Sequence, residues 1–586
     1  MIYSFKVRLL TVVGLFTLCL ILVLARSFQL QILQKDRLQD LARSQQQRTV
    51  VLEPKRGKIF DRNGRILALS VPVGSLYAHP ADIESKHQYA KKLAPHVDIS
   101  FRKLHKLLKS RKPFVWIKRR MDQRQVKAVK ALKLEGIGFI EEFLRYYPER
   151  YSGAAVIGFT GIDSQGLEGI EFEYQDLLKG QSRRYVVEKE GSYRTVPLKG
   201  HPGPLPEQYS LKLTLDSRIQ HLTEEQLAHG VTEARADRGS AIVMDSKTGA
   251  ILAVSTYPGF DPNRYERFSR AHYLNRPVTA GYEPGSTFKV ITLTAALSEG
   301  LITPGQSFFC ENGKFRVRSH TVRDVKKFGK LTLKQVLQKS SNICAAKIGM
   351  SLSPEKFDEY IRRFGFGSRP GTGLAAEASG KLLEPRRWSP LDHASISFGQ
   401  GILVSPIQML AAVNVFSTNG KRVIPYAVEY AIDSRGKKLQ EISVPKNRKV
   451  YRFGPKPHEP IVEPQVARLI NRFMVSVTEE GGTARRVALE GYEIAGKTGT
   501  SQVFDPKLGR YSSTRHIASF AGFVPASDPV ISIIVVIRNP RKSPYGGVVA
   551  GPVFREIARQ TLKLKGIMPS PDLDQGKETV QLSRND

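Results

Sequence analysis

Cysteine and histidine are scarce and scattered in this sequence. The three cysteines, Cys19, Cys310 and Cys344, show no metal-ligand spacing. Cys19 lies in an apolar run, so at most one disulfide can form, which excludes a disulfide-rich scaffold. The 12 histidines form no His-Glu-x-x-His or similar cluster. We therefore expect no metal site and no organic cofactor.

Acidic residues are few beside basic ones. The chain has 54 Asp and Glu against 90 Lys and Arg, a formal net charge of +36. This excess indicates an anionic surface nearby, whether nucleic acid, phospholipid headgroups or an acidic polymer. The chain of 586 residues is too long for one core, so we expect two or more domains, and no internal repeat is visible.

One long apolar run stands near the N-terminus. Residues 9–25 carry no charge, and 17 residues of helix span about 25 Å, enough to cross a bilayer core. Lys6 and Arg8 precede the run, so the positive-inside rule places residues 1–8 in the cytoplasm and everything after Arg26 outside it. No small-x-small cleavage site follows, which favours an uncleaved single-pass anchor in the cytoplasmic (inner) membrane. Nucleic acid is then excluded as a partner, and membrane surface or cell wall is favoured.

The remaining chain divides by composition. Residues 26–205 begin with a polar helix and include short strands and a strongly basic stretch, which we interpret as a solvated helix and strand. A Pro/Gly-rich segment at 200–210 indicates a linker, with the main boundary near residue 206. A second domain is expected at 206–565, followed by a polar, disordered tail at 566–586.

Ser286 and Lys289 form the strongest candidate for a nucleophile and its base. A serine hydroxyl needs a base within hydrogen-bond reach, and i, i+3 spacing puts both side chains on one helix face. Pro284 and Gly285 mark a helix start, which places Ser286 at the positive end of the helix dipole. A capping serine is the alternative. Four other Ser-x-x-Lys pairs have poorer contexts, in loops, at a cap or in the basic stretch: Ser100/Lys103, Ser353/Lys356, Ser434/Lys437 and Ser443/Lys446.

Two further elements downstream complement this pair. Ser340-Ser341-Asn342 and Lys497-Thr498-Gly499-Thr500 follow in the order known for penicillin-interacting serine enzymes. A nearby Lys497 ammonium would keep Lys289 neutral, and Lys497 with the two threonine hydroxyls would bind a substrate carboxylate. Ser340 could pass a proton to the leaving amine, Asn342 could bind a peptide carbonyl, and Gly499 permits close approach of a ligand. A second Lys-Thr-Gly, at 247–249, is interpreted as a hairpin turn.

Taken jointly, these motifs resemble those of class B penicillin-binding proteins, the membrane-anchored peptidoglycan D,D-transpeptidases, over almost the whole chain. The resemblance implies an α+β transpeptidase fold, a central antiparallel sheet flanked by helices, with an elongated N-terminal pedestal domain. Tyr-Glu-Pro-Gly-Ser-Thr-Phe-Lys and Asn342 resemble the septal, FtsI-like branch. Other similar stretches are RGKIFDRNGRILA, GLEGIEFEYQDLLKG, SPIQMLAAVNVFSTNG, HIASFAGFVPASDP and AGPVFREI, with small departures at Ser501 and Gly551.

The implied activity is cross-linking of peptidoglycan stem peptides during septal wall synthesis. Ser286 would form an acyl-enzyme with release of D-alanine, the N–H groups of Ser286 and Thr500 would form the oxyanion hole, and β-lactam antibiotics would acylate the same serine. No glycan-polymerising module is recognisable, so the resemblance implies a SEDS-type glycosyltransferase and other divisome proteins as partners. The alternatives are an elongation-type or spore-type transpeptidase, a D,D-carboxypeptidase, a β-lactamase, a β-lactam sensor and a non-enzymic basic wall-binding protein.

Overall fold

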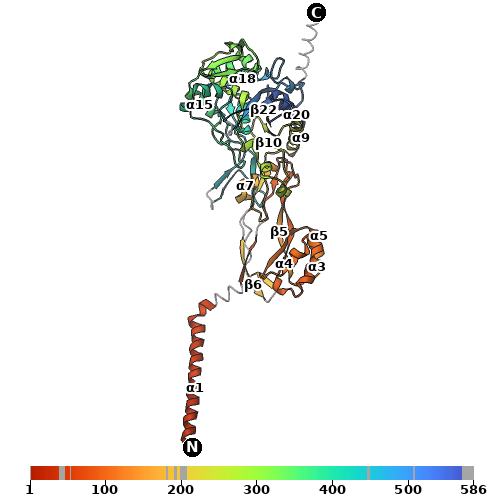
Figure 1. The fold of residues 1–586 in the computed structure, drawn as a ribbon, viewed down its shortest axis with the longest axis vertical. Helices are drawn as coiled ribbons and strands as arrows, with labels where there is room; N and C mark the ends of the chain where they lie inside the picture. Colours follow the sequence, from red (N-terminus) through yellow and green to blue (C-terminus); the bar gives the residue numbers. More distant parts are fainter. Residues whose placement is uncertain are drawn as a thin grey trace. The chain divides into compact units, whose positions relative to one another are not determined.

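The computed structural model describes residues 2–38, 47–52, 55–179, 183–190, 194–197, 208–444, 449–505 and 509–570. The chain forms two compact units (Figure 1). The first comprises Met1–Lys55 and Gly180–Glu207, and the second comprises Arg56–Lys179 and Gln208–Asp586.

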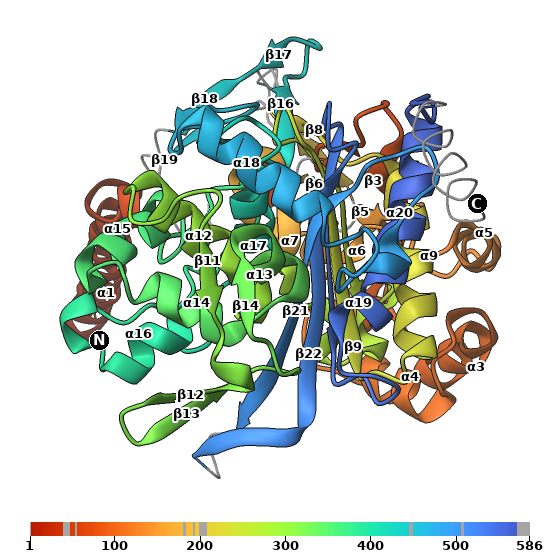
Figure 2. The same cartoon turned by 90° about the horizontal axis from the view of Figure 1, so that it is seen from above.

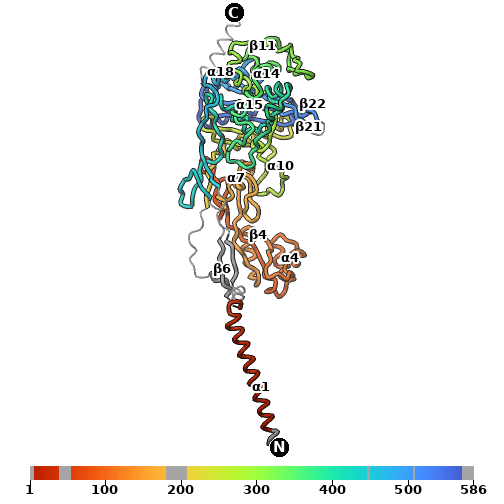
Figure 3. Tube along the Cα trace, turned by 90° about the vertical axis from the view of Figure 1, so that its left-hand side faces the viewer, coloured from red at the N-terminus to blue at the C-terminus, as the bar shows by residue number. Residues whose placement is uncertain are grey.

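The first unit consists of a long helix and a small sheet. Helix α1 (Ile2–Phe28) continues as the π-helix η1 (Gln29–Leu33), and α1 is the red helix of Figure 3. Phe5–Leu33, 29 residues, is long and apolar enough to cross a membrane, because about 40 Å of helix exceeds the roughly 30 Å hydrocarbon core. The apolar run 9–25 lies inside this helix. The antiparallel sheet has the order β1 (Gln47–Leu52), β6 (Arg183–Glu190), β7 (Arg194–Pro197).

A five-stranded antiparallel sheet forms the centre of the second unit, as the resemblance implies. Its strands are rich in β-branched and small apolar residues that are buried on both faces, as in Ile531–Arg538, "ISIIVVIR". The predicted hairpin around 247–249 is confirmed, because its two strands pair antiparallel. In spatial order the strands are β10 (Ile251–Tyr257), β9 (Arg238–Asp245), β23 (Ile531–Arg538), β22 (Arg510–Val524) and β21 (Ala495–Asp505).

Helices cover both faces of this sheet (Figure 2). Helices α9 (Ser217–Glu233) and α20 (Gly551–Leu564) pack on one face around Phe520 and Phe554. The larger hydrophobic core lies on the opposite face and contains Phe288 and buried side chains from eight helices. These are α11 (Arg276–Thr279), α12 (Lys289–Ser298), α13 (Leu333–Lys339), α14 (Asn342–Gly349), α15 (Pro354–Arg363), α16 (Pro390–Ile396), α17 (Pro406–Asn414) and α18 (Pro464–Val475).

A second sheet joins the two sides of the predicted boundary at residue 206. Strand β8, after the boundary, pairs in parallel with β2 and antiparallel with β16. The boundary itself lies outside the described residues, and Arg56–Lys179 belongs to the same compact unit as the central sheet. The strands are β17 (Lys438–Leu439), β16 (Val428–Ile432), β8 (Ser210–Leu213), β2 (Ile59–Phe60), β3 (Ile66–Ala78) and β4 (Val115–Met121), with β5 (Ile137–Tyr146) also paired to β3.

Arg56, the first residue of the second unit, belongs to a buried triad of charged residues with Arg145 and Glu171. The Glu171 carboxylate accepts from Arg56 Nε at 2.5 Å and from Arg145 Nε at 2.6 Å, and all three residues are almost fully buried. The two guanidiniums hold the pKa of Glu171 below its usual value against the opposing effect of burial. Removing one partner would leave a buried, unpaired charge, which typically costs about 3–5 kcal/mol.

The basic stretch within residues 90–150 folds as interpreted. Helix α4 (Phe101–Leu108) buries Leu104 and Leu108 and exposes Lys103 and Lys106. It packs with α3 (Lys86–Val97), α5 (Gln123–Ala131) and β4 around a small core of its own.

Residues beyond 565, the predicted limit of the second domain, form hydrogen bonds with the rest of the unit. The Tyr492 hydroxyl donates to the Ile567 carbonyl at 2.8 Å, and the Ser570 N–H donates to the Gly491 carbonyl at 2.8 Å. Residues 566–570 therefore pack on the rest of the second unit, contrary to the predicted disordered tail, and residues 571–586 lie outside the described residues.

The shorter elements complete the second unit. The helical turns are η2 (Pro80–Asp82), α6 (Ala154–Ile157), α7 (Gly169–Glu173), α8 (Gln175–Lys179), η3 (Pro262–Arg267), α10 (Arg270–Tyr273), η4 (Gly285–Phe288), η5 (Glu311–Gly313), η6 (Pro385–Arg387), η8 (Arg485–Val487) and α19 (Gly546–Val549). The short strands are β11 (Ser307–Phe309), β12 (Lys314–Val317), β13 (His320–Arg323), β14 (Lys330–Thr332), β15 (Lys421–Arg422), β18 (Glu441–Val444), β19 (Lys449–Arg452) and β20 (Glu459–Pro460).

Candidate active site

The turn η4 and helix α12 present Ser286 and Lys289. Ser286 lies in the first turn, as predicted, although that turn is a 3₁₀ helix, and Lys289 begins the α-helix one turn later. Gly285 has φ +56°, and a Cβ there would lie 2.7 Å from the Thr500 carbonyl oxygen. Only glycine tolerates both the left-handed conformation and this approach, so Gly285 brings the Ser286 turn against strand β21.

The junction between α13 and α14 presents Ser340 and Asn342. Ser340 ends α13 in a left-handed conformation with φ +62°, which is costly for a residue other than glycine. Ser341 then caps α14 by accepting from the Cys344 N–H at 3.1 Å. The sharp reversal directs Ser340 and Asn342 toward Lys289: Lys289 Nζ donates to the Ser340 carbonyl at 2.7 Å and to Asn342 Oδ1 at 2.8 Å.

Strand β21 brings Lys497 to the same point. Lys497 Nζ donates to Ser340 Oγ at 2.9 Å and lies 3.3 Å from Thr498 Oγ1, and Lys289 Nζ lies 3.3 Å from Ser340 Oγ. A Cβ at Gly499 would lie 2.8 Å from the Pro284 carbonyl oxygen, so that glycine, too, is required by close backbone packing. The three motifs, which together span more than 200 residues of sequence, thus meet around one hydroxyl, that of Ser340.

Three predicted site residues, Lys289, Thr498 and Thr500, have hydrogen-bond partners other than those expected from the proposed chemistry. Within the described residues, Lys289 makes no hydrogen bond to Ser286. The Thr498 hydroxyl lies 2.9 Å from Thr483 Oγ1, and the Thr500 hydroxyl accepts a long bond of 3.4 Å from the Gly546 N–H. Catalytic hydrogen bonds are often long or unformed without substrate, so these positions stay candidates.

The environment of both lysines opposes their charged forms. Lys289 and Lys497 have no solvent exposure. Burial lowers the pKa of Lys497 to about 7. Burial and, second, the neighbouring Lys497 ammonium lower the pKa of Lys289 well below its ordinary value, while Asp324 acts weakly in the opposite direction. Two buried ammonium groups beside one hydroxyl repel each other, so the pair favours a state with a single proton between them.

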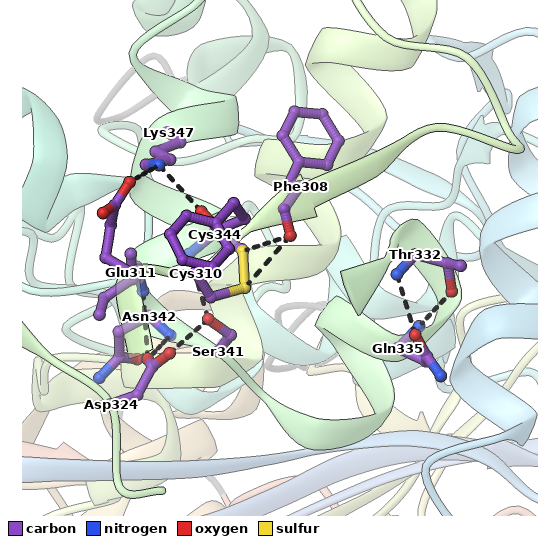
Figure 4. The surroundings of a disulfide bond; sticks show 12 residues. Phe308, Cys310, Glu311, Asp324, Thr332, Gln335, Ser341, Asn342, Cys344 and Lys347 are labelled. Carbon is purple, nitrogen blue, oxygen red and sulfur yellow. Dashed lines mark hydrogen bonds and ion pairs between the residues drawn. A yellow bond between two sulfur atoms is a disulfide. The ribbon is translucent and has the colours of Figure 1, made fainter. Parts of the chain in front are cut away.

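Sequence reasoning missed Asp324, which holds the Ser340–Asn342 segment in place (Figure 4). Its carboxylate accepts from Ser341 Oγ at 2.6 Å and from the Ile343 N–H at 3.1 Å, and it also bonds the Asn342 N–H. Asp324 therefore caps the N-terminus of α14, where the helix dipole favours a negative charge. It lies 17 residues before Ser341 with no motif around it, so the sequence carried no signal.

We expect Asp324→Asn to slow acylation by penicillin about tenfold. The neutral amide weakens the charge-assisted bonds of the cap, which costs about 1.5 kcal/mol or more and loosens Asn342. Loss of the negative charge also lowers the pKa of Lys289 further, so the acid limb of the rate profile should move to lower pH. Stopped-flow acylation across pH measures both effects, with Asp392→Asn, at the cap of α16, as a control. A slower rate with an unmoved acid limb would leave Asp324 a purely structural residue.

The one disulfide that the cysteine count allows joins Cys310 to Cys344, which are 34 residues apart in the sequence. Cys344 lies on α14 two residues after Asn342, and Cys310 follows β11, so the bond ties the β11–β14 segment to the helix (Figure 4). An ion pair between Lys347 and Glu311 lies beside it. The sequence left the pairing open because spacing alone does not select partners.

We expect Cys310→Ala/Cys344→Ala to destabilise the catalytic unit by about 3–4 kcal/mol, the chain-entropy estimate for a loop of this length. The measurement is denaturant unfolding of the oxidised parent and the double variant. Cys19→Ser is the control, since Cys19 is exposed and unpaired. Equal unfolding midpoints of parent and double variant would contradict the prediction.

The second Lys-Thr-Gly and the Ser353/Lys356 pair have local structural roles. Lys247 and Thr248 occupy the β9–β10 turn, where Thr248 bonds Asp245 and Lys247 pairs with Asp528. Ser353 caps α15 by accepting from the Lys356 N–H. The residues of both motifs make these local bonds at the surface, and none of the bonds involves Ser340.

Comparison with known proteins identifies the family. The penicillin-binding protein transpeptidase domain matches residues 239–559, and the penicillin-binding protein dimerisation domain matches residues 51–199. Several relatives match nearly the full chain, among them the following three. The probable peptidoglycan D,D-transpeptidase PenA of Neisseria gonorrhoeae is 34% identical over 94% of this chain and 91% of its own. Stage V sporulation protein D of Bacillus subtilis is 33% identical over 96% and 86%. FtsI of Escherichia coli is 32% identical over 95% and 91%.

Solved structures agree on the fold. Penicillin-binding protein 3 of Mycobacterium tuberculosis, complexed with aztreonam, superposes with a TM-score of 0.68 at 24% identity, covering 89% of this chain and 99% of that one. A peptidoglycan synthetase from Bifidobacterium adolescentis gives 0.70 at 24% identity, covering 89% and 98%. The chain belongs to the penicillin-binding protein transpeptidase family. With a dimerisation domain and full-length relatives of this kind, it is a class B penicillin-binding protein.

Proposed function

We propose that this protein is a peptidoglycan D,D-transpeptidase in which Ser286 is the nucleophile. The observation that carries the assignment of residues is the meeting of Lys289 Nζ and Lys497 Nζ at Ser340 Oγ, at 3.3 and 2.9 Å. A buried lysine kept neutral by a charged neighbour can serve as the base that a serine nucleophile needs.

Lys289 accepts the proton of Ser286 in this mechanism. Its two shortest bonds go to the Ser340 carbonyl and Asn342 Oδ1, which can only accept here. These bonds use the two N–H groups of a neutral amine and leave its lone pair free for the proton. The same bonds fix the direction of the amine, so the lone pair is oriented before substrate arrives.

Ser286 Oγ then attacks the carbonyl carbon of the D-Ala-D-Ala bond. The N–H groups of Ser286 and Thr500 stabilise the negative oxygen; losing one such donor typically costs on the order of 10² to 10³ in rate. Their nearness is supported by the packing of Gly285 on Thr500. As the C–N bond breaks, Ser340 relays a proton to the leaving amine, and D-alanine departs.

The terminal carboxylate of the substrate binds Lys497 and the hydroxyls of Thr498 and Thr500. An amine from a second stem peptide next attacks the ester, forming the cross-link and returning Ser286 Oγ to its protonated state. A β-lactam presents a strained amide and a carboxylate to the same groups, so it acylates Ser286 and blocks the cycle.

The cellular setting extends this proposal. We place α1 across the cytoplasmic membrane with residues 1–8 inside and the catalytic unit outside, supported by Lys6 and Arg8 before the apolar run. A septal role, with a SEDS-type glycosyltransferase and divisome proteins as partners, is supported by likeness to FtsI. Likeness to stage V sporulation protein D supports a spore-wall role as the second candidate. The domain limits 26–205 and 206–565 stay predictions.

Product analysis tests the proposed reaction. The purified full chain is incubated in detergent with a stem peptide ending in D-Ala-D-Ala and an amine acceptor, and products are identified by mass. Cross-linked product with release of D-alanine is expected. Hydrolysed peptide alone would make the protein a D,D-carboxypeptidase, and no release of D-alanine would support a sensor or a non-enzymic wall-binding protein.

A further inference from the structure

The positive charge of the chain is concentrated in one small lobe of the second unit. This basic lobe comprises residues 86–133, which form α3, α4, β4 and α5 and the turns between them (Figure 1). It contains 16 Lys and Arg against two Asp and Glu, so it contributes +14 to the formal net charge of +36. The proposed reaction uses none of these residues, so their charge has another cause.

The three helices of the basic lobe carry basic residues without acidic partners. They contain no Asp or Glu, and none of their Lys and Arg forms a salt bridge within the part of the chain that the structure describes. The two acidic residues of the lobe have other roles: Asp98 pairs with Lys118 at 2.7 Å, and Asp122 caps α5. An ordinary solvated helix mixes both signs, as α15 does where Lys356 pairs with Glu359. The nine basic residues of the helices, all exposed except Lys86, are Lys86, Lys91, Lys92, Arg102, Lys103, Lys106, Arg124, Lys127 and Lys130.

The starts of two of these helices show that the charges do not serve the fold. Arg102 and Lys103 lie in the first turn of α4, and Arg124 lies in the first turn of α5. The positive end of a helix dipole repels cations at such positions. Ser100 precedes α4 without capping it through its side chain. An anion bound from outside would offset this repulsion.

The basic lobe also lies too far from the larger core for its charge to act on the reaction. Strand β3 connects the two regions: Leu67 and Ala68 pack in the larger core, whereas Leu76 and Ala78 pack in the core of the lobe. β3 and β5 pair continuously over ten residues, a ribbon of about 30 Å. Charges in solution are screened within about 8–10 Å at physiological ionic strength. The charge of the lobe is therefore available to a partner outside the protein.

The proposed anchor makes the lipid bilayer the favoured partner. Helix η1 ends at Leu33 and the second unit begins at Arg56, 23 residues later. Such a chain reaches up to roughly 75 Å, which exceeds the length of the β3–β5 ribbon. A lobe tethered in this way meets the membrane at high effective concentration, so several weak attractions together hold it there. No large hydrophobic side chain is exposed in residues 86–133, which indicates contact with headgroups without insertion.

We propose that the basic lobe binds the anionic phospholipid headgroups of the bilayer that α1 crosses. This inference rests on the proposed placement of α1 across the cytoplasmic membrane and on no step of the reaction. Each Lys or Arg near an anionic membrane surface strengthens binding about fivefold. The three basic residues of α4 thus shift the equilibrium between bound and free lobe by about a hundredfold.

Lysine footprinting in lipid nanodiscs tests this contact. The full chain is placed in discs of phosphatidylcholine alone or of equal parts phosphatidylcholine and phosphatidylglycerol, and the reactivity of each lysine toward an amine reagent is measured by mass. Lys91, Lys106 and Lys127 should react at least about fivefold more slowly in the anionic discs. Their reactivity should recover when salt is raised from about 0.1 M to about 1 M, which shortens the screening length to about 3 Å. Lys356, already paired on α15, is the internal reference and should not change.

A triple variant of α4 removes the central part of the charge. Arg102→Gln/Lys103→Gln/Lys106→Gln should restore the reactivity of Lys91 and Lys127 in anionic discs. Its melting temperature should not fall, because two of the removed charges oppose the helix dipole. Protection that persists in this variant would overturn the proposal.

The turn between β16 and β17 provides the charge-matched control. Arg435→Gln/Lys437→Gln/Lys438→Gln removes the same three charges from exposed positions and should keep the protection of the lobe. Both triple variants should still form the penicillin adduct. Loss of the adduct from the parent, with protection intact, would overturn the proposed function and leave this inference standing.

The remaining outcomes identify what the lobe binds. Equal reactivity of the lobe lysines in both kinds of disc would overturn the proposal. Protection that appears only after soluble polyphosphate is added would also overturn it, and would assign the lobe to an anionic polymer. A chain that enters discs of neither composition would overturn the proposed anchor and this inference with it.

Discussion

Replacing Ser286 by alanine should abolish the covalent adduct with penicillin. Alanine removes the only atom that can form the ester, while the turn η4 keeps its fold because its packing depends on Gly285 and Thr287. Intact mass after incubation with labelled penicillin gives the result directly: the parent gains one penicillin mass, and Ser286→Ala gains none. The cross-linking activity should disappear together with the adduct.

The chain supplies a matched control for this experiment. Ser353 and Lys356 have the same spacing as Ser286 and Lys289, but Ser353 only caps α15. Ser353→Ala should lose about 1 kcal/mol of helix-cap stabilisation and keep the full adduct. An adduct that survives in Ser286→Ala would mean that another nucleophile reacts, and the proposed mechanism would have to be abandoned.

Local features of the fold were predictable where the signal lies in neighbouring residues. The helix start at Pro284-Gly285, the Lys-Thr-Gly turn at 247–249 and the apolar run all have short-range physical causes, and the structure contains each of them. The limits of α1 differ from the apolar run because helix geometry continues through Lys6 and Arg8, whereas hydropathy reports only the uncharged core. The central antiparallel sheet was implied by the family resemblance and not by the pattern of residues, and the order of its strands was not predicted.

Long-range contacts within the site were not predictable in the same way. Asp324 contacts Ser341 and Asn342 because the chain directly after β13 lies against the start of α14. The buried triad of Arg56, Arg145 and Glu171 likewise unites residues up to 115 apart. Such partners depend on tertiary packing, and a charged residue in sequence looks the same whether it is solvated or buried.

The spacing of the Ser-x-x-Lys motif predicts the position of Lys289 but not its hydrogen-bond partners. The i, i+3 spacing correctly places Lys289 one turn after Ser286, but spacing says nothing about what else competes for the amine. In the structure its donors go to Ser340 and Asn342, which belong to the second motif. The second motif therefore orients Lys289, the proposed base of the first motif, a relation visible only once both are folded.

Replacing Lys289 by glutamine should reduce the penicillin acylation rate by about 10² to 10⁴, the usual contribution of general base catalysis. Glutamine can still donate to Ser340 and Asn342 but cannot accept the serine proton, so reversible binding of penicillin should change little. Stopped-flow acylation separates the two quantities, because the rate at saturation falls while the concentration at half-saturation is retained. Lys356→Gln, in the matched Ser-x-x-Lys pair, should leave both unchanged.

The pH profile decides whether the lost group is the base. In the parent, acylation should fall as pH falls through the lower pKa of the lysine pair, because a second proton converts the neutral Lys289 amine to ammonium. The rate should also fall at high pH, as Lys497, with its pKa near 7 in the free protein, loses the charge that holds the carboxylate. Lys289→Gln should lose the acid limb and keep the alkaline one. An acid limb that persists in Lys289→Gln would move the role of first proton acceptor to another group, with Lys497 or Ser340 next to be tested.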